Sequence, residues 1–237
     1  MKLFKFERHK DVIVAGITLI MMWAGYYCSQ HEVGGRMFSF CLSIGIMILL
    51  CVVFPVWWVT HIDKEGIAGL RIQRQNLGIS LVLSALLAVW RGYGAREYMF
   101  QMGAVWTILF NLLAIWEVIF IYGWLFTRFE KCFGKIPAIL LTAVSVGIYH
   151  IGSLTPDAIL RLCGCVLICS VAYAVVNNIF LLWPIYWAIG TSASTMGSGM
   201  SFPMEMVIMS AGILAIQIAI IVGMEIRFRK KVKAMRV

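Results

Sequence analysis

The sequence has few charged residues for its length. Of its 237 residues, 13% are charged and 62% are hydrophobic, whereas a soluble globular domain carries about 25% charged residues. The ranges 12–28 and 37–60 contain no charged residue, and each is long enough to cross a hydrocarbon core of about 30 Å, which takes roughly 17–25 apolar residues. This composition excludes an ordinary soluble protein and predicts an all-α, polytopic membrane helix bundle.

The chain is also poor in the residue patterns of a metal centre or a cleavable leader. It has only four histidines, and Cys163, Cys165 and Cys169 among its seven cysteines do not have a typical zinc spacing. The first apolar run is longer than a signal-peptide core and is followed by others, so it predicts a retained segment. With no repeat or low-complexity linker, residues 1–237 are expected to form a single transmembrane domain.

Apolar runs between charge clusters predict about eight transmembrane helices. Of the twenty Lys and Arg residues, sixteen fall on one side of the membrane when the N-terminus is placed inside, and four fall outside. Basic residues stay on the cytoplasmic side, so we expect both termini to be cytoplasmic. The predicted spans are 12–28, 37–60, 77–90, 102–126, 136–154, 158–176, 179–190 and 204–226.

The net charge of +9 does not need a nucleic-acid partner to explain it. Much of it comes from the basic C-terminal tail, residues 227–237. Basic residues beside a membrane gain about 1 kcal/mol each near anionic lipids. We therefore expect anionic lipids to contact this cytoplasmic tail.

Glu117 differs from the other charged residues because it lies far from the ends of its predicted span. No other charge lies between Glu97 and Arg128, and Glu117 lies about 14 Å from the cytoplasmic end of its span at 1.5 Å per residue. A carboxylate at that depth costs at least about 2.5–3.5 kcal/mol, so it predicts a functional group facing the bundle interior. The alternative is a protonated, structural carboxyl group bonded to a neighbouring helix.

His150 is the second candidate, because it lies inside the fifth predicted span whereas the other histidines lie in or beside loops. Counting the helical rise places it about 7 Å deeper than Glu117, a gap that helix tilt could close. The stretch around Pro184 is the third candidate. Its residues Asn178, Trp183 and Tyr186 could form a further wall of a cavity containing Glu117. Alternatively, they could form an interfacial aromatic belt with a proline kink.

A carboxylate near an imidazole can take a proton from water and pass it on, which is general acid–base hydrolysis. The same pair could relay protons in a transporter. The residue types alone do not distinguish hydrolysis from a proton relay in a transporter. A transporter is disfavoured because the sequence shows no inverted repeat and only one mid-membrane acid.

The segment "EVIFIYGWLFTRFEKCFGKIPAILLTAVSVGIYHIG" (117–152) resembles the CPBP intramembrane proteases, which include CAAX prenyl endopeptidases and bacteriocin-processing proteins. The family motif E-E-x-x-x-R falls on Glu117, Val118 and Tyr122, and F-x-x-x-H falls on Val146 and His150. The resemblance covers about residues 60–192 and includes an eight-span, CAAX-protease-like architecture. No histidine follows His150, so the family's third motif is missing.

This resemblance implies an intramembrane endopeptidase in a bacterial plasma membrane. Glu117 would activate water, His150 would assist, and Tyr122, Asn178, Trp183 and Tyr186 would line the site. The substrate would be a membrane-embedded or lipidated peptide. A divalent metal such as zinc is a possible cofactor, but one Glu and one His fall short of the three protein ligands usual for catalytic zinc, so no metal ligand is assigned. The alternative is a catalytically inactive relative that acts in bacteriocin self-immunity or as a binding scaffold.

Overall fold

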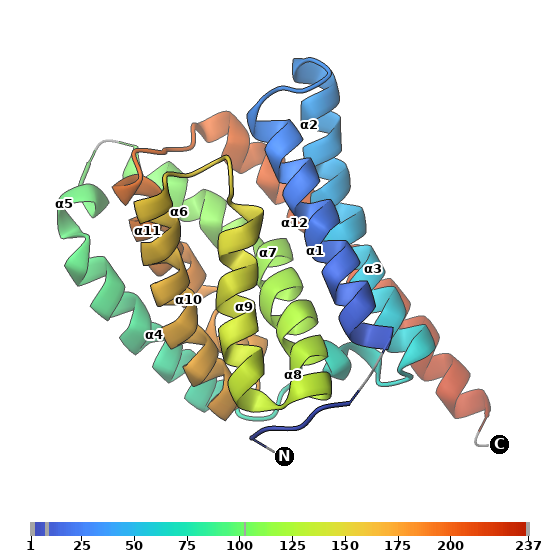
Figure 1. Cartoon of the computed structure of the whole chain (residues 1–237). Helices are drawn as coiled ribbons and strands as arrows, with labels where there is room; N and C mark the ends of the chain where they lie inside the picture. The colour runs from blue at the N-terminus through green and yellow to red at the C-terminus, as the bar shows by residue number, and fades with distance from the viewer. Residues whose placement is uncertain (1–2, 8–9, 102, 236–237) are drawn as a thin grey trace.

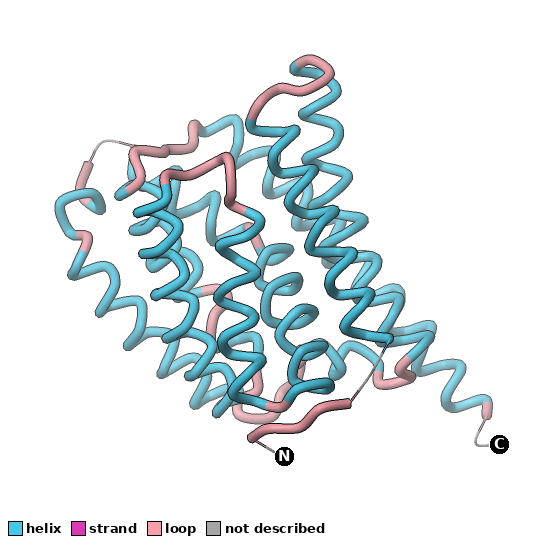
Figure 2. The backbone as a smooth tube through the Cα atoms, in the orientation of Figure 1, coloured by secondary structure: helices cyan, strands magenta, loops and turns pink. Residues whose placement is uncertain are grey.

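The computed structural model describes residues 3–7, 10–101 and 103–235. Within these residues the chain is 81% helical and has no strand, which confirms the predicted all-α class (Figure 2). Several residues used in the sequence analysis lie outside the described ones: Lys2, Arg8 and Arg236 of the charge count, Met102 at the start of the fourth predicted span, and 236–237 of the tail.

The described chain contains α-helices joined by short 3-10 and π-helical stretches, which are labelled η. The α-helices are α1 (Lys10–Gln30), α2 (Arg36–Gly45), α3 (Phe54–Trp57), α4 (Leu77–Gly94), α5 (Arg96–Met99), α6 (Ala104–Leu113), α7 (Ile115–Val118), α8 (Thr127–Phe133), α9 (Lys135–Tyr149), α10 (Pro156–Val176), α11 (Ser192–Gly197) and α12 (Met204–Ala234). The π-helices are η1 (Ile46–Val53), η2 (Trp58–Ile62), η4 (Ile119–Phe126) and η6 (Trp187–Thr191), and the 3-10 helices are η3 (Gly66–Leu70) and η5 (Ile179–Leu181).

Five helices of the described chain are long and apolar enough to cross a membrane. A sixth is added if α6 and the continuous helix Ile115–Phe133, which are bent by 50°, count as one span. The five are Lys10–Gln30, Arg36–Ile62, Leu77–Gly94, Pro156–Val176 and Met204–Ala234. The other two predicted spans do not reach this length, because α9 has 15 residues and the range 179–190 is divided between η5 and η6.

The loops gather at two opposite ends of the bundle (Figure 1). At the end that carries residues 3–7 and the C-terminal part of α12, Asn76 Nδ2 donates to the carbonyl of Val176 at 3.2 Å. At the opposite end, His31 Nε2 donates to the carbonyl of Gly152 at 2.9 Å. The first end is called the terminal end below, and the second the far end.

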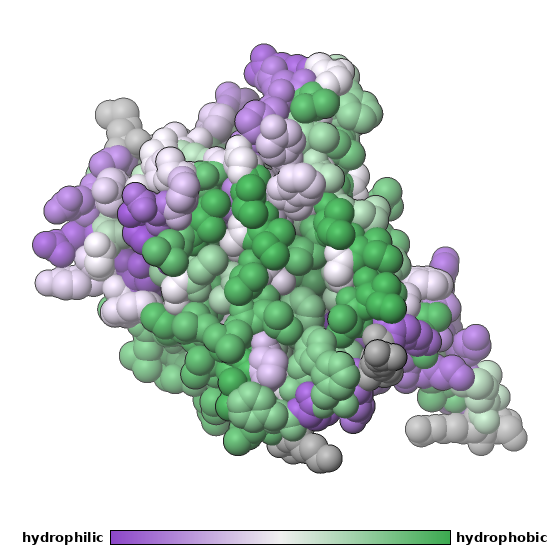
Figure 3. Space-filling view, viewed as in Figure 1, coloured by the Kyte–Doolittle hydropathy of each residue, from purple (hydrophilic) through white to green (hydrophobic). Residues whose placement is uncertain are grey.

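The surface between these two ends is apolar. The space-filling view shows hydrophobic side chains across the middle of the molecule and polar ones toward the two ends and along α12's last turns (Figure 3). Ile13, Val82 and Ile208 are among the large apolar side chains that are exposed there. Such a band fits contact with lipid chains, and the fold is that of an integral membrane protein.

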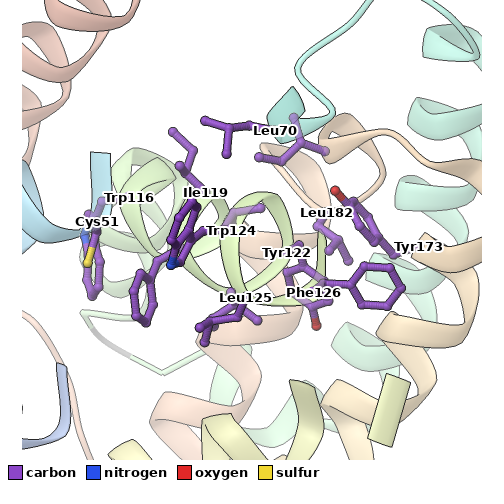
Figure 4. Close-up of a cluster of buried hydrophobic side chains, with 14 of the residues drawn as sticks. Cys51, Leu70, Trp116, Ile119, Tyr122, Trp124, Leu125, Phe126, Tyr173 and Leu182 are labelled. Atoms are coloured by element: carbon purple, nitrogen blue, oxygen red, sulfur yellow. The ribbon is translucent and has the colours of Figure 1, made fainter. Parts of the chain in front are cut away.

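The centre of the bundle is the continuous helix Ile115–Phe133. Every residue of η4 is buried, and a helix that is hydrophobic on all sides belongs inside a protein. Figure 4 shows its side chains Tyr122 and Phe126 beside Leu182 and Tyr173 from later segments. This central helix also carries Glu117.

A charged network fixes the central helix at the terminal end. Arg128 is fully buried, and its Nη1 lies 3.0 Å from Asp11 Oδ2 and 2.6 Å from Asp63 Oδ2. Its guanidinium also lies 4.8 Å from the ring centroid of Trp124. Lys131 extends the network to Asp63 at 3.0 Å. These contacts hold the central helix against α1 and the segment after η2.

Candidate functional site

Glu117 owes its position to an interruption between two helices. The helix α6 ends at Leu113, Ala114 adopts a non-helical conformation (φ −83°, ψ 55°), and a new helix begins at Ile115 with a 50° change of direction. Glu117 therefore lies in the first turn of the central helix. Unsatisfied N–H groups give a helix N-terminus a partial positive charge that stabilises a carboxylate by roughly 0.3–1 kcal/mol or more.

The Glu117 side chain is held by a tyrosine. The hydroxyl of Tyr149, the last residue of α9, donates to Glu117 Oε1 at 2.6 Å. The indole nitrogen of Trp187 also approaches this carboxyl group, without completing a regular hydrogen bond. Glu117 is only partly buried, so the residue keeps some exposed surface.

Three π-helical stretches meet around Glu117. The central helix changes to η4 directly after α7, Trp187 is the first residue of η6, and Cys51 of η1 lies within electrostatic range of the carboxyl group. Wide π-helical turns occur frequently at functional sites. Their convergence at one partly buried acid marks this region as the candidate site.

His150 belongs to the same cluster but does not touch the acid. Its ring lies 4.2 Å from the ring of Tyr149 and 5.3 Å from the ring of Tyr26 in α1, centroid to centroid. Among the described residues, no hydrogen bond or ion pair joins His150 to Glu117. Tyr149 contacts both of them, and Tyr26 lies within electrostatic range of the carboxyl group. The residues Glu117, Tyr149, His150, Tyr26 and Trp187 are called the Glu117 cluster below.

The hydrogen bond of His150 sets its tautomer. Nδ1 lies 2.8 Å from the carbonyl oxygen of Val146, which can only accept. Nδ1 therefore carries the proton, and Nε2 of the neutral ring has the free lone pair. Nε2 is thus the ring nitrogen that can accept a hydrogen bond or a proton.

Of the four residues predicted to line the site, Tyr122 and Tyr186 lie on the α10 side of the Glu117 cluster. The ring centroid of Tyr122 lies 6.3 Å from that of Trp187 and 5.2 Å from that of Tyr173. Tyr186 adjoins Tyr122 and Cys169, and its backbone N–H donates to Ser84 Oγ at 3.0 Å.

The contacts of Asn178 and Trp183 lead elsewhere. Asn178 Nδ2 donates to the carbonyl oxygens of Gln73 and Gln75 at 3.0 and 2.6 Å, at the terminal end. Trp183 Nε1 donates to the carbonyl of Leu112 at 2.8 Å. Both side chains tie segments of backbone together, and no contact between them and Glu117 is described.

Sequence reasoning missed Tyr149 and Tyr26 as members of the cluster. Both look like ordinary aromatic residues of apolar helices, and only the position of Tyr149 next to His150 gave any signal. Trp187, three residues after Pro184, was not among the predicted site residues. Its sequence neighbour Trp183 turned out to point toward Leu112.

The donor set does not fit a catalytic zinc ion. Such a site needs about three protein ligands, and the described residues contain no group of three or more His, Cys, Asp or Glu side chains that could hold a metal. Cys163, Cys165 and Cys169 are free thiols on α10. Any catalysis at the Glu117 cluster is therefore assigned to its own side chains.

No protein-family model, no curated protein sequence and no solved structure matches this chain.

Proposed function

We propose that the chain crosses a bacterial plasma membrane eight times, with both termini in the cytoplasm. The support is the alternation of its connecting segments: 31–35, 95–101, 151–155 and 198–203 belong to the far end, and 63–76, 134 and 177–178 to the terminal end. The two segments that are too short to span alone, α9 and 179–197, lie against neighbouring helices. Short or irregular segments at membrane depth are tolerated where protein buries them.

We further propose that the protein is an intramembrane endopeptidase of the CPBP type. The observation that carries this proposal is the hydrogen bond from Tyr149 to Glu117, with the His150 ring tilted against the same tyrosine at 4.2 Å between centroids. It places an acid, a phenol and an imidazole with a free Nε2 in one cluster inside an apolar bundle. A mid-membrane carboxylate is a functional group by default.

The chemistry would begin with a water molecule beside the second carboxylate oxygen of Glu117. Glu117 takes one proton from this water, and the resulting hydroxide attacks the carbonyl carbon of the peptide bond. The C–N bond then breaks, and the leaving amine receives a proton from protonated Glu117 or from His150 Nε2 if that nitrogen has been protonated. General acid–base catalysis of this kind contributes about 10²–10⁴-fold in rate. Tyr149 would keep the carboxylate oriented throughout.

The substrate would be a membrane-embedded or lipidated peptide. The Glu117 cluster lies within the apolar part of the bundle, so a chain that reaches it gains by carrying apolar surface of its own. A lipid anchor adds about 0.8 kcal/mol per buried CH₂. Such a substrate would be concentrated in the bilayer around the protein.

One observation favours a second candidate function. Tyr149 lies between Glu117 and His150, and no hydrogen bond joins these two groups in the described chain. A protein that binds the same kind of peptide without cleaving it, as in bacteriocin self-immunity or scaffolding, requires no contact between them.

A cleavage assay separates the two functions. Purified protein in lipid nanodiscs would be screened against a library of lipidated fluorogenic peptides, with peptide binding measured in parallel. We expect Glu117→Gln to lose activity by about 10²-fold or more, because the amide cannot act as a base. The exposed Glu97→Gln serves as the matched control and should behave as the wild type.

Unchanged cleavage by Glu117→Gln would eliminate the endopeptidase. Peptide binding without cleavage by the wild type, unaffected by His150→Gln, would instead support the scaffold. Thermal unfolding of each variant shows whether a loss of activity reflects a loss of folding.

A further inference from the structure

The acidic side chains at the terminal end are all used in internal pairs. Asp63 and Asp11 bind Arg128, Glu65 binds Lys131 at 2.9 Å, and Glu7 binds Lys5 at 3.4 Å. Two more acids follow the same pattern: Glu130 binds Arg71 at 2.9 Å and Glu225 binds Arg229 at 2.7 Å. Little negative charge is therefore left to face outward at this end.

Basic side chains at the same end are left in excess. Arg227, Lys230, Lys231 and Lys233 of α12 and Lys64 in the loop after η2 are exposed. None of the ion pairs of the described residues includes these five. They are called the α12 basic surface, and Figure 1 shows the last turns of α12 leaving the bundle beyond α3.

The base of this surface is fixed to the bundle. The backbone N–H of Ile67 donates to Glu225 Oε2 at 3.0 Å, and the Phe228 ring lies against Gly66. Gly66 has a φ of +64°, and an added Cβ would lie 3.0 Å from both Phe228 and Glu225. The basic residues therefore extend from the bundle as a continuation of one anchored helix.

The length of α12 places these cations at a bilayer surface. Its 31 residues span about 46 Å at 1.5 Å per residue, whereas the hydrocarbon core is about 30 Å thick and takes about 20 residues. Counting from Met204, the core is filled at about residue 223. Exposed Val222 and Ile226 mark the edge of this apolar part, and the cations begin at Arg227 in the headgroup layer.

We infer that the α12 basic surface binds the anionic headgroups of phospholipids in the leaflet at the terminal end. The cations follow directly on lipid-facing apolar residues of the same helix, which a protein or nucleic-acid partner would not require. Each basic residue near an anionic surface adds attraction that falls off within a Debye length of about 8–10 Å at physiological salt. This inference does not depend on the Glu117 cluster.

The test measures lipid selectivity of the full chain reconstituted in phosphatidylcholine vesicles. Spin-labelled phosphatidylglycerol and spin-labelled phosphatidylcholine are compared by electron paramagnetic resonance, which reports the fraction of each lipid held at the protein. Replacing Lys230, Lys231 and Lys233 by Gln should lower the preference for phosphatidylglycerol at least about twofold. These side chains are exposed beyond the bundle, so the fold should persist.

The matched control removes the same number of charges from the far end, by Arg36→Gln, Arg96→Gln and Arg161→Gln, and should retain the preference. Salt at about 1 M, where the Debye length is about 3 Å, should lower the preference of the wild type for phosphatidylglycerol as the three tail substitutions do. An unchanged preference in the tail variant, or an equal loss in the control, would overturn the inference. So would displacement of the labelled lipid by an RNA oligonucleotide, which would assign the surface to nucleic acid.

Discussion

Replacing Arg128 by Gln is the most demanding test of how the central helix is held. The Arg128 side chain has no exposed surface, and its Nη1 contacts Asp11 and Asp63 at 3.0 and 2.6 Å. Removing one partner of such a buried pair leaves uncompensated charge and costs about 3–5 kcal/mol. At about 2–4 °C per kcal/mol for a chain of this size, we expect Arg128→Gln to lower Tm by roughly 6–20 °C.

The assay is thermal unfolding of the purified protein in detergent, followed by tryptophan fluorescence. Arg74→Gln is the matched control, because Arg74 is exposed at the same end and surface substitutions change stability by about 0.5 kcal/mol or less. A Tm for Arg128→Gln that equals that of this control would refute the assigned network.

A double-mutant cycle with Asp63→Asn sharpens the test. Groups that contact each other show interaction energies of about 0.5–3 kcal/mol, so Asp63→Asn should cost less in the Arg128→Gln background than in the wild type. Equal costs in both backgrounds would mean that the 2.6 Å contact contributes nothing.

Two further predictions concern the same terminal end and the packing of α9. Burial raises the pKa of Asp63, but Arg128 and Lys131 lower it more, so its pKa lies below the ordinary 3.8. Its ion pairs stabilise the fold above that value and are lost as pH falls through the lowered pKa. A Tm series should therefore show a decline below about pH 4 that is weaker in Asp63→Asn. In α9, a Cβ on Gly147 would lie 2.7 Å from Cys163 Sγ. Gly147→Ala should thus cost about 1–3 kcal/mol, and Cys163→Ala should restore most of it in the same unfolding assay; absence of rescue would contradict this packing.

Much of the fold could be predicted from local sequence patterns. Charge-free apolar runs located the five long apolar helices and the bent pair, and Glu117 was singled out as the one acid between Glu97 and Arg128. Pro184 was expected to interrupt the seventh span, and it lies in the turn between η5 and η6. A proline has no N–H to donate, so a regular helix does not run through it.

The pairings between distant residues could not be predicted in this way. Asp11 stands at the edge of the first apolar run, and nothing in that pattern indicates that the structure buries it against Arg128, 117 residues away. Tyr149 likewise gave no signal of its own, because a tyrosine in an apolar helix is ordinary and its hydrogen bond to Glu117 depends on how two helices cross. Periodicity and hydropathy describe one helix at a time, whereas these contacts depend on the tertiary arrangement.

The wide turns of η4 lie between Glu117 and Arg128 on the same continuous helix. A π-helix closes i→i+5 hydrogen bonds, whereas each α-helical residue turns the chain by about 100°. Losing one residue between Ile119 and Phe126 would therefore rotate Glu117 by about 100°, a little over a quarter of a turn, away from Tyr149, while Arg128 kept its ion pairs. Insertions and deletions in this stretch should thus damage the protein more than most substitutions do.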